Sequence, residues 1–271
     1  MLSDITIGQF FPGKSFLHRL DPRMKIVLTV LYVAAVFVPR NWFGLAAAIV
    51  FLAVAVALSG LPFKLIWKSV RPILPVVALT AVLNVFYVQG GRVLWEWQFL
   101  HITEKGLVSA AFLALRIVCL IVGSSLLTYT TGPTTLTDAL ERLMNPLKAI
   151  RVPVHELAMM MTIALRFIPT LIEETEKIMA AQKARGADLE SGNMMQRVKA
   201  LVPVMIPLFV SSFRRAYELA TAMECRCYHG GDGRTRMVQL RTAPRDWLAL
   251  TVTLALVVAM IWLNRIVAPV L

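Results

Sequence analysis

The chain has 271 residues, of which 58% are apolar and 16% are charged, and its mean hydropathy is +0.68. Soluble domains average about 45–50% apolar and about 25% charged residues, so this composition excludes a water-soluble fold and favours a helical membrane protein. The formal net charge is +12. In so apolar a chain, Lys and Arg retained on the cytoplasmic side of a membrane explain this excess, and no nucleic-acid partner is expected.

Five segments are apolar and long enough to be predicted as membrane spans, for which about 20 residues are typical. They cover 25–39, 43–60, 72–89, 107–130 and 246–268. The sequence thus predicts an N-terminal membrane part over 1–131, a cytoplasmic region over 132–245 and a C-terminal span within 246–271.

The basic residues predict the orientation of these spans. With the N-terminus inside, all but five of the 28 Lys and Arg residues lie in cytoplasmic segments. Because positive residues concentrate on that side, we expect a cytoplasmic N-terminus and an external C-terminus. The five exceptions are Arg40, Arg92, Lys105 and Arg265, in external segments, and Arg116, within the fourth span.

The region 132–245 has the pattern of amphipathic helices. A short helix is predicted to begin at Thr134 or Thr135, which can cap it, and its leucines recur every three or four residues. A longer helix over 154–184 is interrupted by Pro169, where we expect a kink. We therefore predict an all-α polytopic membrane protein with about five transmembrane helices and about three amphipathic cytoplasmic helices.

Two of these predicted helices end in an arginine. Arg185 precedes Gly186, a residue that accepts the positive φ of a helix C-terminus. Arg226 lies near the end of a helix predicted over 196–228 and has small neighbours. One such arginine is most often a solvated surface charge, but two in comparable settings favour recognition of a partner, since a guanidinium binds carboxylates through paired hydrogen bonds.

The sequence contains no recognisable catalytic, nucleotide or metal site. The interiors of the predicted spans contain no Asp, Glu or His, so an intramembrane ion relay has no candidate residue. Cys225 and Cys227 are too closely spaced for the usual zinc half-site, and packing thiols are the favoured reading. Arg116 is the one charge at membrane depth, and both a functional role and a structural one, paired with carbonyls or Asn84, are open.

Five motifs extend over nearly the whole chain. They are SFLHRLDPRMK at 15–25, SSLLTYTTGP at 124–133, ALRFIP at 164–169, AQKARG at 181–186 and AMECRCY at 222–228. Together they resemble the transmembrane component of prokaryotic energy-coupling factor transporters, EcfT, and its relative CbiQ of cobalt systems. The resemblance implies a multi-pass protein of the cytoplasmic membrane.

The resemblance also implies a non-catalytic subunit that joins a small substrate-binding membrane subunit to two ABC-type ATPase subunits, for uptake of a vitamin or a transition-metal ion. The partners would bind ATP and Mg, and no cofactor is expected on this chain. ATPase contacts are implied for two triplets, in the second of which cysteines replace the usual Ala and Gly or Ser. The triplets are Ala184, Arg185 and Gly186, and Cys225, Arg226 and Cys227.

Apolar residues on the two long amphipathic helices are the expected contacts with the substrate-binding subunit. A stand-alone permease or channel is the alternative, but it needs a polar pore lining that the predicted spans do not supply. The expected contacts are Met159, Met160, Met161, Leu165 and Phe213.

Overall fold

The computed structural model describes residues 10–88, 93–97, 100–187, 193–231 and 239–267. Two compact units divide the chain. We call Gly8–Leu136 with Leu240–Leu271 the membrane unit, and Thr137–Gln239 the α7–α8 unit.

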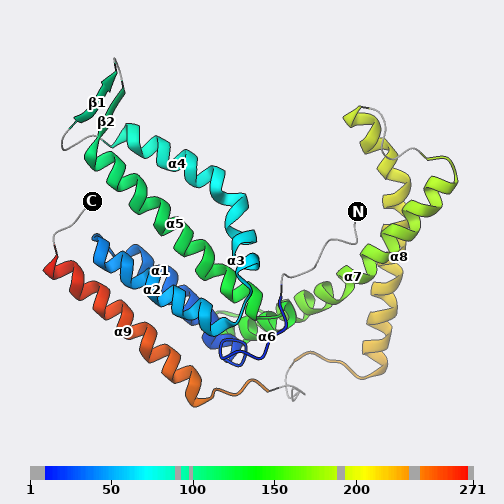
Figure 1. Cartoon of the computed structure of the whole chain (residues 1–271). Helices are drawn as coiled ribbons and strands as arrows, with labels where there is room; N and C mark the ends of the chain where they lie inside the picture. Colours follow the sequence, from blue (N-terminus) through cyan, green and yellow to red (C-terminus); the bar gives the residue numbers. More distant parts are fainter. Residues whose placement is uncertain (1–9, 89–92, 98–99, 188–192, 232–238, 268–271) are drawn as a thin grey trace. The chain divides into compact units, whose positions relative to one another are not determined.

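The membrane unit is built around α5 (Glu104–Thr130), which packs against four other helices (Figure 1). Its buried core includes Tyr32, Leu52, Val122 and Met260. The neighbours of α5 are α1 (Pro22–Phe37), α2 (Trp42–Ser59), α3 (Phe63–Val70) and α4 (Leu74–Tyr87), with η1 (Arg71–Ile73) between the last two, and α9 (Pro244–Ile266) packs on α1 and α2. A hairpin of β1 (Val93–Trp97) and β2 (Leu100–Thr103) precedes α5.

Side-chain caps fix where three of these helices begin. The Asp21 carboxylate accepts from Arg23 N before α1, and the Asn41 side chain accepts from Gly44 N at the start of α2. Thr103 caps α5 in the same way. Each cap satisfies a backbone N–H that the first helical turn leaves unpaired.

The motif before α1 joins the first helix to the last. Asp21 N donates to Asp246 Oδ1 of α9 at 2.8 Å, and Arg23 Nη2 donates to Leu240 O at 2.9 Å. Lys25 Nζ donates to Thr130 O, at the C-terminal end of α5, at 2.9 Å. The polar residues at 15–25 therefore hold the start of α1 against α9, the segment before α9 and the end of α5.

Five helices in the described chain are long and apolar enough to cross a membrane: α2, the α3–α4 run, α5, α7 and α9. The first predicted span is absent from this set because α1 has 16 residues, roughly 24 Å at 1.5 Å per residue. The sequence predicts α7 as a cytoplasmic helix, but by length and composition α7 is also apolar enough to cross a membrane. Its second half carries Glu173, Glu174, Glu176 and Lys177, so only its first half is apolar.

The α7–α8 unit consists of two long helices that contact each other and cross (Figure 1). Helix α7 spans Val154–Ala184 and continues through Pro169, and α8 spans Met194–Cys225. The helix α6 (Pro133–Leu143) and η2 (Asn145–Ile150) precede α7. Arg215 Nη2 donates to Glu174 Oε2 at 2.6 Å, and Gln182 Nε2 donates to Pro203 O at 3.3 Å.

Candidate functional site: two arginine-tipped helices

Helix α7 ends in a hydrogen-bonded cap built around Gly186. Gly186 N donates to Lys183 O and Ala187 N donates to Gln182 O, both at 3.0 Å, while Gly186 has a φ of 85°. This pair of bonds is the Schellman motif, which satisfies the last carbonyls of a helix and favours glycine at the left-handed position. Arg185 is the residue just before that glycine, at the C-cap.

Helix α8 ends with the same geometry, although cysteine replaces glycine. Cys227 N donates to Glu224 O at 2.9 Å and Tyr228 N donates to Met223 O at 3.0 Å. The φ of Cys227 is 55°, so the second motif keeps the left-handed conformation without the residue that adopts it most easily. Arg226 occupies the C-cap, as Arg185 does in α7.

Both arginine tips are exposed. Arg185 and Arg226, and the small residues on either side of each, lie at the surface. Within the described residues, neither guanidinium takes part in a hydrogen bond or ion pair. Each fork of N–H donors is therefore available to a carboxylate of another protein.

The tips lie toward opposite ends of the crossed pair. Gln182, near the first tip, contacts Pro203 of α8, and 23 residues separate Pro203 from Arg226. At 1.5 Å per helical residue, the two arginines are on the order of 35 Å apart. The Glu174–Arg215 ion pair joins the helices between them.

A hydrogen-bonded chain connects the second tip to the start of α7. His155 Nδ1 lies 3.0 Å from Glu141 Oε1, and His155 Nε2 lies 3.4 Å from the hydroxyl of Tyr228. Because a carboxylate only accepts, Nδ1 donates to Glu141, and the Nε2 of a neutral ring then accepts from Tyr228. Gly231 packs on the ring, since a Cβ there would lie 2.2 Å from Cδ2 of His155.

Apolar side chains form rows along both helices. Among the residues predicted to contact a substrate-binding subunit, Met160, Met161 and Phe213 are exposed, the last to 73%, while Met159 and Leu165 are partly buried. The row on α8 is longer than this prediction. It comprises Met195, Val198, Val202, Met205, Ile206, Phe209, Val210, Phe213 and Tyr217.

Known proteins resemble this chain over almost its full length. Residues 13–237 match the family model described as CbiQ, cobalt transport protein. The energy-coupling factor transporter transmembrane protein EcfT of Clostridium kluyveri is 55% identical over 258 residues, which cover 95% of this chain and 96% of that protein. Those of Ruminiclostridium cellulolyticum and Bacillus subtilis are 53% and 45% identical, over 97% and 98% of this chain and 97% and 100% of theirs. The chain belongs to the EcfT family.

The resemblance predicted from the motifs is thus confirmed. As an EcfT family member, the chain is the transmembrane component of an energy-coupling factor transporter, and its apolar helices make it a multi-pass membrane protein.

The intramembrane charge of this EcfT family member has a structural explanation. Arg116 Nη2 donates to Pro39 O at 2.5 Å, in the turn between α1 and α2. Its guanidinium carbon lies 4.8 Å from the ring centroid of Phe112, a cation–π distance. The Asn84 side chain, the other possible partner, donates to Thr80 O within its own helix. Of the two readings that the sequence leaves open, the contacts favour the structural one.

The remaining predictions concern cysteine and metal. Cys225 and Cys227 are free and exposed, so they are not packing thiols, as the sequence suggested, but surface residues of the second tip. In the described part of the chain, no three His, Cys, Asp or Glu side chains gather closely enough to hold a metal ion.

Sequence reasoning did not find the His155 chain. Its members, Glu141, His155 and Tyr228, are 14 and 73 positions apart, a spacing that no motif or periodicity captures.

Proposed function

We propose that this EcfT family member couples two ATPase subunits to a small substrate-binding membrane subunit. In this proposal Arg185 and Arg226 each bind carboxylates in a groove of one ATP- and Mg-binding subunit. The observation that carries the proposal is the shared geometry: both arginines occupy the C-cap of a Schellman motif on one joined pair of helices. A partner made of two similar ATPases has two similar grooves for such tips.

Movement of the ATPases would then change the positions of the two tips. The apolar rows of α7 and α8, including Met160, Met161 and Phe213, would pass that movement to the substrate-binding subunit. Methionine-rich surfaces suit this task because their side chains adapt to changing partners. That other subunit would bind the vitamin or transition-metal ion. In this arrangement the N-terminus of the present chain is cytoplasmic and its C-terminus external.

Charge reversal at both tips tests the coupling. In the complete transporter, we expect the double variant Arg185→Glu, Arg226→Glu to lose its ATPase subunits during purification. Hydrogen bonds to charged groups contribute about 1.5–3 kcal/mol each, so two lost contacts weaken association by about 100-fold or more. Arg214→Glu is the matched control, since Arg214 is an exposed arginine of α8 away from the tip. Unchanged association and ATP-driven uptake in the double variant would refute the role of the tips.

A stand-alone permease or channel predicts a different result. The chain would then move substrate across liposomes without any ATPase. We expect no such transport by the purified chain, and its observation would overturn the coupling function whatever the tips do.

A further inference from the structure

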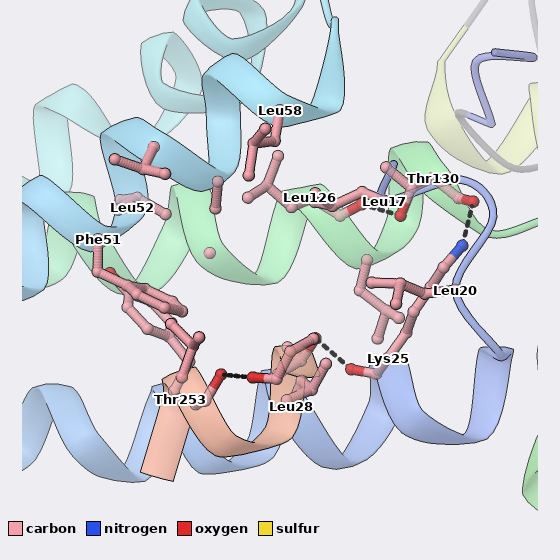
Figure 2. A pocket seen from close by; sticks show the side chains of 18 of the residues that line it. Leu17, Leu20, Lys25, Leu28, Phe51, Leu52, Leu58, Leu126, Thr130 and Thr253 are labelled. Carbon is pink, nitrogen blue, oxygen red and sulfur yellow. Dashed lines mark hydrogen bonds between the residues drawn. The ribbon is translucent and has the colours of Figure 1, made fainter. Parts of the chain in front are cut away.

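The membrane unit contains a cavity of about 260 Å³, lined by α1, α2, α5, α9 and the segment before α1 (Figure 2). This volume is many times the roughly 30 Å³ that one water molecule occupies in the liquid, so the cavity is more than a packing defect. Apart from Lys25, Tyr32 and three threonines, its lining side chains are apolar or glycine. Leucines such as Leu28, Leu52 and Leu126 form much of the wall.

The three threonines do not make the cavity polar. The hydroxyls of Thr29, Thr130 and Thr253 each donate to a carbonyl of their own helix four residues earlier, at 2.7–2.8 Å. A buried water needs two to four polar partners, and the protons of these three hydroxyls are already used, so besides Lys25 only the Tyr32 hydroxyl, which has no partner in the described residues, offers a donor. Hydrocarbon therefore suits the cavity better than water.

The cavity opens between α2 and α9. At one end of this pair the helices are held together, because Asn41 Nδ2 donates to Leu263 O at 3.0 Å and Arg40 N donates to Asn264 Oδ1 at 3.1 Å. Toward the other end the cavity lies between them, and its rim residues are about half exposed. These are Val54 and Leu58 on α2 and Leu248 and Val252 on α9. In a bilayer such an apolar rim borders lipid acyl chains.

A buried cation lies at one end of this cavity. Lys25 is 7% exposed, and its ammonium donates to Thr130 O at 2.9 Å (Figure 2). It also donates to His18 O at 3.3 Å. Within the described residues it forms no close ion pair, since Asp21 pairs with Arg23 and Asp246 accepts from two backbone N–H groups, although both carboxylates attract the ammonium from a greater distance. An ammonium has three donors, so one remains for a ligand. Buried charges are normally paired at hydrogen-bond distance, and an anion at the remaining donor would supply such a partner.

We propose that this cavity binds one anionic phospholipid, with an acyl chain in the cavity and the phosphate beside Lys25. The chain would restore the dispersion contacts that an empty cavity lacks. Because lipid tails are as apolar as the leucines around them, the tail gives little selectivity, and the charge at Lys25 sets the preference. Basic pockets between transmembrane helices on the cytoplasmic side bind anionic headgroups, and the predicted orientation places Lys25 on that side.

Lipid retention by the delipidated full-length chain tests this site. Native mass spectrometry would compare phosphatidylglycerol with phosphatidylcholine of identical acyl chains. We expect one tightly held phosphatidylglycerol, with an affinity at least about tenfold above that of phosphatidylcholine, the ratio expected from one charge-assisted contact. Equal retention of the two lipids by the unmodified chain would overturn the proposal.

Two variants separate the tail from the headgroup. Ala55→Trp places a bulky side chain in the cavity and is expected to abolish the tight binding of phosphatidylglycerol. Its control is Ala53→Trp, because Ala53 is exposed, does not line the cavity and is two residues away on another side of α2. Lys25→Met should still bind the acyl chain, but the ratio of the affinity for phosphatidylglycerol to that for phosphatidylcholine should fall to near one. Tight, selective binding that persists in Ala55→Trp would refute the site even if Lys25→Met fails to fold.

Discussion

Replacing Gly186 with alanine should loosen the first arginine tip without creating a clash. Its φ of 85° is left-handed, and a Cβ built there meets no atom within 4 Å. The cost is therefore conformational, about 1–2 kcal/mol for an L-residue in this region. Alanine also lowers the entropy of the unfolded chain, which offsets about 0.4–1 kcal/mol, so a net loss of about 1 kcal/mol is expected.

A loss of about 1 kcal/mol raises the open fraction of the last turn about fivefold. Hydrogen–deuterium exchange should detect it at the amides of Gly186 and Ala187, which donate to Lys183 O and Gln182 O in the closed cap. If the ATPases bind the closed tip, their affinity should fall by the same factor.

The second glycine of this kind supplies the control. Gly230 has a φ of 103° and open space around its Cβ position, so Gly230→Ala imposes a similar strain away from the first tip. It should leave exchange at Gly186 unchanged. The reverse change, Cys227→Gly, should slow exchange at the second tip by up to about fivefold, because it relieves the strain of a non-glycine residue. Wild-type exchange in Gly186→Ala would refute the assignment of this cap.

Two further changes test packing. His155→Ala removes the hydrogen bond to Tyr228, so hydrogen exchange at the Tyr228 amide should rise up to about tenfold, and His155→Gln should partly restore its protection. Exchange at the wild-type rate in His155→Ala would contradict a role of this hydrogen bond in holding the second tip. Gly123→Ala places a Cβ 2.4 Å from Cε1 of Tyr32, forcing α5 away from α1 at a cost of about 1–3 kcal/mol, seen as a lower Tm in detergent. Gly132→Ala, whose Cβ meets only Thr135 Oγ1 at 3.5 Å, is its control, and an equal Tm for both would count against the close contact.

The sequence predicts the long helices of the α7–α8 unit well because their signals are local. The predicted helix over 154–184 matches α7, because its apolar periodicity continues to the residues just before Gly186, a residue type that commonly ends helices. The helix predicted over 196–228 ends instead at Cys225, because Cys227 adopts the left-handed conformation. The sequence does not predict this end, since cysteine has no preference for that conformation. The hairpin at 93–103 lies where the sequence predicted only a loop.

Features that depend on distant residues could not be predicted. The partner of Arg116 is a backbone carbonyl in a turn 77 residues earlier. Since every residue has a backbone carbonyl, the sequence does not indicate which one will be the acceptor. The cavity beside Lys25 results from four helices that meet incompletely, which no single segment encodes. The motif at 15–25 was recognisable by resemblance, whereas its role in joining α1 to α9 needed the bond from Asp21 to Asp246.

That bond also sets an order of events during synthesis. Asp246 follows Asp21 by 225 residues, and at about 5–20 residues per second the ribosome needs roughly 10–45 s to supply it. During that interval the amide of Asp21 lacks its final acceptor, and the short helix α1 lacks α9, one of the helices that bury it. The nascent chain must therefore hold α1 in an unfinished bundle until α9 is made, so the synthesis of α9 is the step that allows the membrane unit to close.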